Sequence, residues 1–241
     1  MFEKRTLENR RIAVIAADGF EKIELTVPVA ALRAKGAEVD IISLKPGRIR
    51  GVNVHEPAGK VEVNATLDDA DPDDYDALLI PGGLISPDLL RQSAAARQFV
   101  RTFDAARKPI AMICHGPWLM ASAGLLRGRT LTSWPGVRDD MVNAGATWLD
   151  QPVVRDGNWV SSRGPQDIRQ FVKAMTELFA EAGPIPESAP RTLYSDPQRD
   201  APPGAMTAAM RLLPRPSLRT LVGVAVVSAG IVAASKRRAA P

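Results

Sequence analysis

The chain has 241 residues, 45% of them hydrophobic, which is an ordinary proportion for a globular protein. Residues 183–241 hold eight Lys or Arg against three acids, so the whole-chain charge of +4 leaves −1 for residues 1–182 and excludes a basic nucleic-acid groove there. The single cysteine excludes an internal disulfide and fits a reducing compartment. Residues 1–11 are charged and lack the apolar core of a secretory signal, so we expect a cytoplasmic protein.

The first half of the chain alternates short apolar runs with a helical pattern. The apolar run at 11–17 predicts a buried strand, and apolar residues at helical spacing predict a helix over 21–35 that stops at Gly36. A second strand is expected at 38–43, short strands and loop at 47–63, and a third buried strand at 77–80.

The second half continues this alternation. We expect a helix over 88–107, a strand at 109–113, a helix that resumes after Pro117 and runs through Leu125, a β-rich stretch to Ser162, and an amphipathic helix over 166–182. Short strands between helices predict an α/β fold with a mostly parallel sheet covered on both faces. In such a sheet the functional site lies beyond the carboxyl ends of the strands. Three segments follow such ends: 18–24, 81–83 and 114–115.

Cys114 is the candidate nucleophile. It follows an apolar strand and precedes a Gly-Pro helix start, which is the sequence pattern of a nucleophile elbow. Amides and the positive end of a helix dipole at that position are expected to favour thiolate and lower the thiol pKa. The alternative is a buried cysteine that only packs. The adjacent His115 is a candidate acid or base, although neighbouring side chains at a turn often diverge.

Two further groups are candidates for the same site. Gly82 and Gly83 offer unobstructed backbone amides that, with the amide of His115, predict an oxyanion hole, although a plain turn is the alternative. Glu21 and Glu24 lie in the first turns of the predicted helix at 21–35. Glu24 is placed to hydrogen-bond the sulfur, whereas a solvated acid at a helix start is the alternative for Glu21.

The chain changes character after Ala182. Residues 183–217 are Pro-rich without sustained periodicity and predict a disordered linker. Residues 218–241 contain an uncharged stretch at 220–235 with basic flanks, which predicts a hydrophobic helix. At about 1.5 Å per residue this helix is shorter than a bilayer core of about 30 Å unless it extends into its flanks. We favour a membrane anchor, and an interfacial or partner-binding helix is the alternative.

Residues 11–179 resemble the PfpI family of the class I glutamine-amidotransferase-like superfamily. The resemblance rests on four separated stretches: DGFEKIELTVPVAAL at 18–32, LLIPGGLISPDLLR at 78–91, PIAMICHGPWLMASAGLLRGRTLTSWPGVRDDMVNAGATW at 109–148, and VVRDGNWVSSRGPQD at 153–167. It implies a flavodoxin-like three-layer sandwich for residues 1–182, assembled as a dimer or larger homo-oligomer. The tail lies outside the resemblance.

The resemblance also implies roles for the site residues. Cys114 is the nucleophile, Glu24 the acid that contacts it, and His115 lies beside it. Asp88 matches an acid that peptidase-like members supply from the adjacent subunit, although it is Asp where some members carry Glu and lies one residue further along. The amidotransferase reaction is excluded, because its triad needs a later histidine and none follows His115.

The expected function is therefore a cofactor-independent and metal-independent cysteine hydrolase or lyase. Its substrates would be reactive carbonyls or glycation adducts, as in the glyoxalase and deglycase activities attributed to the family together with stress protection. An intracellular cysteine peptidase is the close alternative. A redox sensor or chaperone that uses Cys114 is the alternative from another class.

Overall fold

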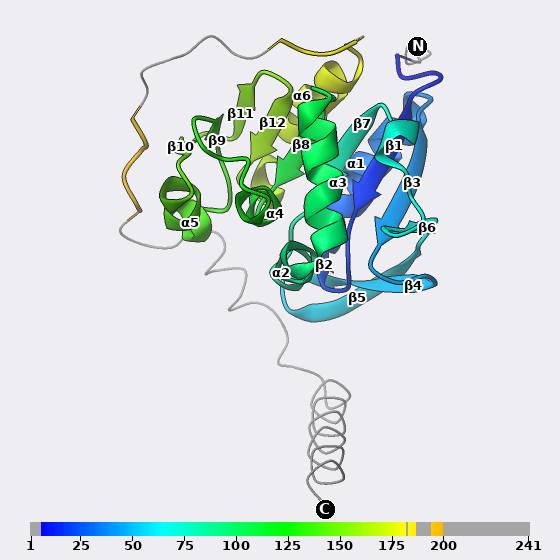
Figure 1. Ribbon diagram of the computed structural model, residues 1–241. Coiled ribbons are helices and arrows are strands. Elements are labelled where there is room, and N and C mark those ends of the chain that lie inside the picture. The colour runs from blue at the N-terminus through cyan, green and yellow to red at the C-terminus, as the bar shows by residue number, and fades with distance from the viewer. Residues whose placement is uncertain (1–5, 182, 187–193, 200–241) are drawn as a thin grey trace, which may run out of the picture. The chain divides into compact units, whose positions relative to one another are not determined.

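The computed structural model describes residues 6–181, 183–186 and 194–199, and these residues form an α/β fold (Figure 1). Every neighbouring pair in its seven-stranded sheet is parallel except β11–β12. The order across the sheet is β11 (Val153–Asp156), β12 (Trp159–Ser162), β8 (Ile110–Ile113), β7 (Ala77–Ile80), β1 (Arg11–Ile15), β3 (Glu38–Ser43) and β6 (Ala65–Thr66). Cys114 follows β8, which lies beside the central strand β7.

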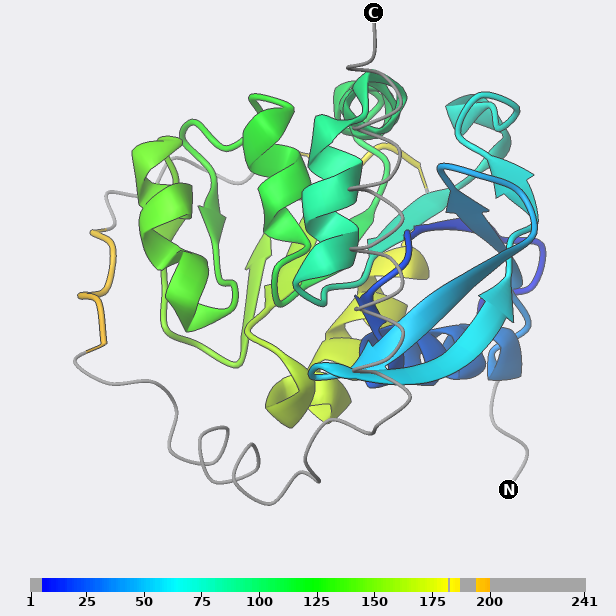
Figure 2. The same ribbon diagram turned by 90° about the horizontal axis from the view of Figure 1, so that it is seen from below.

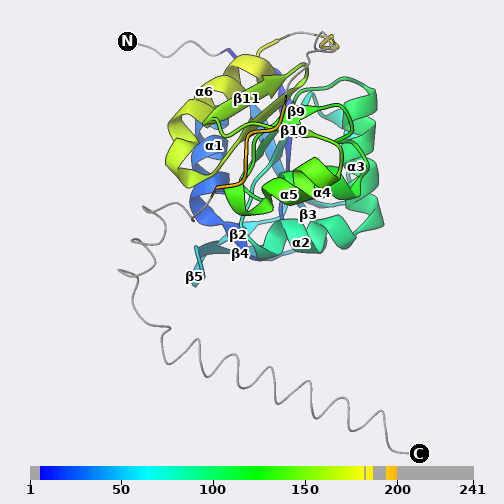
Figure 3. The same ribbon diagram turned by 90° about the vertical axis from the view of Figure 1, so that its left-hand side faces the viewer.

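Helices cover both faces of the sheet (Figures 2 and 3). One face carries α1 (Lys22–Ala34) and α6 (Ile168–Phe179), and the other carries α2 (Ile85–Gln92), α3 (Ala94–Ala105) and α4 (Pro117–Ser122), with α5 (Arg138–Asn143) beside α4. Within the described residues, three short 3₁₀ turns span Pro72–Asp74, Pro135–Val137 and Pro165–Asp167. These layers are consistent with the expected flavodoxin-like sandwich.

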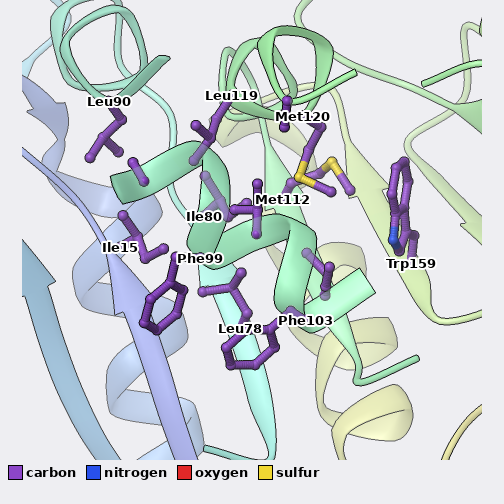
Figure 4. Close-up of a cluster of buried hydrophobic side chains, with 14 of the residues drawn as sticks. Ile15, Leu78, Ile80, Leu90, Phe99, Phe103, Met112, Leu119, Met120 and Trp159 are labelled. Atoms are coloured by element: carbon purple, nitrogen blue, oxygen red, sulfur yellow. The ribbon is translucent and has the colours of Figure 1, made fainter. Parts of the chain in front are cut away.

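The apolar core divides into two clusters because successive residues of a strand point to opposite faces. In β1, Ala13 and Ile15 belong to the cluster under α3 and α4, while Ile12 and Val14 belong to the cluster under α1 and α6. Figure 4 shows the first cluster, with Phe99 and Phe103 of α3 packed over Leu78. Because the central strands are buried on both faces, they appear in the sequence as continuous apolar runs.

Two small sheets lie at the margins of the domain. One has the order β2 (Phe20–Glu21), β4 (Arg48–Asn53) and β5 (Glu56–Glu62), and the other pairs β9 (Thr130–Leu131) in parallel with β10 (Thr147–Trp148). The short strands expected over 47–63 are thus the antiparallel hairpin β4–β5.

One predicted helix is two helices, and the stretch predicted to be β-rich contains its strands β9 to β12 but also a helix. The single helix expected over 88–107 is α2 followed by α3, because the backbone of Ser93 is extended and its hydroxyl accepts the amide of Ala96 as an N-cap. The stretch expected to be β-rich up to Ser162 contains helix α5, which begins directly after the 3₁₀ turn at Pro135–Val137. Local capping therefore overrode the periodicity in the first case.

The predicted linker and tail lie mostly outside the described residues. Residues 183–186 and 194–199 of the predicted linker are described, and the predicted hydrophobic helix at 218–241 is not. Among the described residues no helix is long and apolar enough to cross a membrane.

Candidate active site

Cys114 occupies a strained turn between β8 and α4. Its φ is +61°, a left-handed conformation that costs a non-glycine residue about 1–3 kcal/mol. Neighbouring backbone fixes it from both sides: the Cys114 amide donates to Ser162 O at 3.0 Å, and the Trp134 amide donates to Cys114 O at 2.9 Å. This is the sharp strand-to-helix turn expected from the sequence.

Glycine at position 82 allows the strand ends to meet. A Cβ at Gly82 would lie 2.5 Å from the Cβ of Cys114 and 2.5 Å from Oε2 of Glu24, so no larger residue fits without displacing them. At Gly83 the φ of +90° also favours glycine. The loop after β7 therefore brings α1 and the cysteine turn into direct contact.

Glu24 is completely buried on α1 and reaches the cysteine turn. Its Oε2 accepts the amide of Gly82 at 2.9 Å, while its Oε1 has no hydrogen-bond partner among the described residues. Burial, with a smaller contribution from the charge of Glu21, raises the pKa of Glu24 to about 8. At neutral pH this carboxyl group is therefore mostly protonated and can donate its proton toward Cys114.

The surroundings of Cys114 have opposing effects on the pKa of its thiol. Burial first, and then the charge of Glu24, raise the pKa of the thiol well above its ordinary value, whereas the amides of Gly83 and His115 lower it by hydrogen bonding. The expectation of a lowered pKa was therefore wrong, because burial outweighs the amides. Since Glu24 and Cys114 influence each other strongly, the two groups titrate as a pair that shares protons.

His115 turns back toward the cysteine. Its Nδ1 lies 3.1 Å from Sγ of Cys114, so this nitrogen donates or accepts according to the tautomer. Burial lowers the pKa of His115 to about 4, which leaves the imidazole neutral at pH 7 and able to accept a proton. The ring lies between two tryptophans: it is stacked with Trp134 at 6.1 Å and edge-on to Trp118 at 5.0 Å, both between ring centroids.

The donors around the sulfur differ from those expected. The amide of Gly82 is taken by Glu24, so it is not free to bind an oxyanion, and that part of the prediction was wrong. The amides of Gly83 and His115 are the pair that faces the sulfur. An oxyanion hole from these two amides is retained as a hypothesis.

Glu21 and Asp88 are not brought to the sulfur within one chain. Glu21 is half-buried, and its Oε2 accepts the amide of Val54 at 2.8 Å, so it holds the β4–β5 hairpin. Burial raises its pKa. Asp88 is exposed on α2 and contacts Gln92 of its own helix at 3.1 Å. A role for Asp88 in a neighbouring subunit remains a prediction.

Ser162 and Trp134 were missed in the sequence, although both hold the backbone of Cys114. Ser162 ends a strand that becomes the neighbour of β8 only in the folded sheet, so its role had no local signal. Trp134 follows β9 in the stretch TSWPG, where a lone aromatic residue before Pro-Gly is an available but weak indication. In the described part of the chain, no group of three or more His, Cys, Asp or Glu could hold a metal ion.

Comparison with known proteins identifies relatives over the described domain. The DJ-1/PfpI family matches residues 10–178. The relative named Deglycase PfpI, from Pyrococcus furiosus, is 44% identical over 169 residues, which are 68% of this chain and 99% of the relative. A protein of Bacillus subtilis named Putative cysteine protease YraA is 40% identical over 172 residues, which are 71% of this chain and 99% of the relative.

Solved structures show the same fold. A two-domain protein of Anabaena variabilis, with DJ-1/ThiJ/PfpI-like and ferritin-like domains, superposes with a TM-score of 0.68 at 29% identity and covers 74% of this chain and 50% of that one. Drosophila melanogaster DJ-1beta gives a TM-score of 0.65 at 27% identity over 71% of this chain and 91% of its own. The chain belongs to the DJ-1/PfpI family.

Proposed function

We propose that this protein is a cofactor-independent cysteine enzyme that acts on small reactive carbonyls or on the early adducts they form with amines and thiols. The observation that carries the proposal is the arrangement at one sulfur: a buried, protonated Glu24, two backbone amides, and a neutral His115 nitrogen at 3.1 Å. The relative named Deglycase PfpI, at 44% identity, supports the same class of substrate.

The chemistry can be followed with a 2-oxoaldehyde such as methylglyoxal. The sulfur of Cys114 adds to the aldehyde carbon, and the proton of the Glu24–Cys114 pair goes to the aldehyde oxygen, giving a hemithioacetal. A base then removes the proton from this carbon, and the proton is returned to the neighbouring carbon, so the hemithioacetal becomes a thioester of the hydroxy acid. Water cleaves the thioester, which releases lactate and restores the thiol.

Two side chains are suited to the proton movements. Glu24, with a pKa of about 8, can both give and take a proton near neutral pH, which is the property required of a general acid–base. The imidazole of His115 starts neutral and therefore begins as an acceptor. The amides of Gly83 and His115 would hold the negative charge that develops beside the sulfur.

Peptide hydrolysis is the second candidate, and the name of the Bacillus subtilis relative favours it. It would use the same sulfur and amides, with an additional acid. Asp88 is exposed on α2 beside Leu84, whose exposed fraction is 59%, and Ile85, with 52%. Apolar side chains around an acid fit a contact with a second copy of the chain, so we connect the peptidase hypothesis to a homo-oligomer.

A redox role of Cys114 must be distinguished from both the carbonyl activity and the peptidase activity. The amides and the protonated carboxyl that would stabilise a thiolate would also stabilise the anion of a sulfenic or sulfinic acid. Such a role needs Cys114 but no turnover.

One experiment distinguishes these possibilities. Purified protein is incubated with methylglyoxal, with a glycated peptide and with a fluorogenic peptide, beside Cys114→Ala as a control. We expect lactate from methylglyoxal and repair of the glycated peptide, both lost in Cys114→Ala. Turnover of the fluorogenic peptide alone would favour the peptidase. Absence of Cys114-dependent turnover with all three would overturn the enzymatic proposal, and peroxide-dependent sulfenic acid would then favour the sensor.

A further inference from the structure

Residues 194–199, hereafter the strap, lie along the free edge of β10 (orange in Figures 1 and 3). The Asp196 amide donates to Trp148 O at 2.8 Å, and the Trp148 amide donates to the hydroxyl of Ser195 at 3.0 Å. The Asp150 amide donates to Oδ2 of Asp196 at 2.7 Å. The strap lies beyond the family match, which ends at residue 178.

Arginines fix the middle and the C-terminal end of the strap. Arg138 donates through Nε and Nη2 to the carbonyl of Asp196 at 2.9 and 2.8 Å. Arg199 donates to both oxygens of Asp150 at 2.7 and 2.6 Å, in the two-pronged geometry that only a guanidinium provides. Hydrogen bonding from Arg199, and to a lesser degree from Arg163, lowers the pKa of Asp150.

Arg163 connects this cluster to the end of β12. Its Nη1 donates to Asp150 at 2.9 Å, and its Nε and Nη2 donate to Asp167 at 2.8 and 3.1 Å. With Arg199 present, two guanidinium groups contact the carboxylates of Asp150 and Asp167. Without it, Arg163 would be the one guanidinium described at both carboxylates.

The backbone of Arg163 lies between Ser162, which bonds Cys114, and Gly164, which lies near Trp134. Before it, Ser162 O accepts the Cys114 amide at 3.0 Å. After it, a Cβ on Gly164 would lie 3.4 Å from the ring of Trp134. Trp134 in turn donates its amide to Cys114 O and stacks on His115. Both groups that hold the strained backbone of Cys114 are therefore close to Arg163.

We propose that Arg199 of the strap is a positioning residue for Cys114, acting through Asp150 and Arg163 on the end of β12 that holds the cysteine amide. A strained turn keeps its geometry only where its surroundings fix it, and the strap adds one of these fixed points. The inference rests on the proposed function in one respect, namely that Cys114 is the reacting group. It assigns a catalytic consequence to a segment outside the family domain.

The test uses the full-length chain and the pH dependence of Cys114 alkylation by iodoacetamide, which needs no turnover. In Arg199→Ala a looser turn exposes the sulfur to water, and burial is the largest cause of its raised pKa, ahead of the opposing amides of Gly83 and His115. We expect the pH midpoint to fall by about 0.5, so that alkylation at neutral pH becomes about threefold faster. Arg199→Lys keeps the charge but not the two-pronged contact and should show a smaller shift.

Two comparisons separate positioning from general stability. Gln198→Ala, at an exposed strap residue, is the matched control and should leave the midpoint unchanged. Asp150→Ala combined with Arg199→Ala should shift the midpoint no further than Asp150→Ala alone, because both act along one path. A lower melting temperature in Arg199→Ala with an unaltered alkylation profile would overturn the proposal. A shifted profile in a protein that turns over no carbonyl would refute the proposed function and leave the positioning role intact.

Discussion

Glu24 and Cys114 both lie against the backbone of Gly82. A Cβ at position 82 would come within 2.5 Å of Oε2 of Glu24 and of Cβ of Cys114. Glu24 is held there by the amide of Gly82 at 2.9 Å, and it is fully buried. The two reactive side chains thus depend on a residue that has no side chain. This relationship makes the acid, the thiol and the intervening loop one unit for mutational analysis.

Glu24→Gln is expected to abolish most of the turnover while leaving the fold intact. The amide side chain can still accept the Gly82 amide and donate toward sulfur, but it cannot release a proton. Loss of a general acid–base lowers rates by about 10²–10⁴-fold. The measurement is kcat/KM for methylglyoxal, with circular dichroism to verify folding; activity within threefold of the native value would exclude Glu24 from proton transfer.

Although Glu24→Gln lowers turnover, it is expected to stabilise the folded protein at alkaline pH. The pKa of Glu24 is about 8 in the folded state against an ordinary 4.5, so the unfolded chain loses this proton first. The contribution of Glu24 to the free energy of unfolding is therefore fully present below about pH 4.5 and is lost as the pH rises through about 8. Glu24→Gln should remove this decline, so its melting temperature should exceed that of the native protein at pH 9 by more than at pH 5. Equal differences at both pH values would contradict the raised pKa.

Gly82→Ala is expected to disable the site more than it destabilises the domain. The added methyl group would displace Cys114 or Glu24, and misplacement by about 1 Å costs about 10²-fold in rate. Gly59→Ala is the matched control, because a Cβ there would meet nothing within 4 Å. Comparison of kcat/KM and melting temperature for the two variants tests this, and equal activities would show that the contact is dispensable.

His115→Phe should keep the ring between Trp118 and Trp134 and remove the nitrogen beside sulfur. On the acid side of the profile, native activity should fall as the pH drops through about 4, where His115 becomes charged. In the variant, this acid limb should disappear and the plateau rate should be lower. A pH–rate profile from pH 3.5 to 8 distinguishes a proton acceptor from a residue that only packs, because packing alone would leave the plateau unchanged.

Substitution of Asp88 tests whether a second copy of the chain completes the site. If a second copy supplies Asp88 to the sulfur, Asp88→Asn should reduce peptide turnover without changing the melting temperature. Leu84→Asp should both dissociate the oligomer and remove that activity, as measured by light scattering and a fluorogenic peptide. A native protein that is monomeric at assay concentration would exclude this arrangement.

The sequence predicted the strands and the cysteine turn because both have local causes. β1, β7 and β8 are continuous apolar runs, and Cys114 is placed by the Gly-Pro that begins the next helix. The contact between Glu24 and the cysteine turn followed from the rule that parallel strand ends converge.

What could not be predicted depends on contacts that are distant in sequence. The high pKa of the thiol comes from complete burial, which no motif displays, and the engagement of the Gly82 amide by Glu24 needs both positions in space. The docking of 194–199 on β10 depends on Asp150 and Arg138, and nothing in the Pro-rich composition of residues 183–217 indicates it.

The hydrogen bond from the Cys114 amide to Ser162 also has a consequence for biosynthesis. β12, which ends at Ser162, leaves the ribosome after the cysteine, and the strap leaves later still. A nascent chain that has reached the cysteine but not Ser162 lacks one of the backbone groups that hold the turn. The backbone turn of the nucleophile is therefore complete only when β12 is in place, so a chain that ends before Ser162 has the cysteine but lacks one of the contacts that define its geometry.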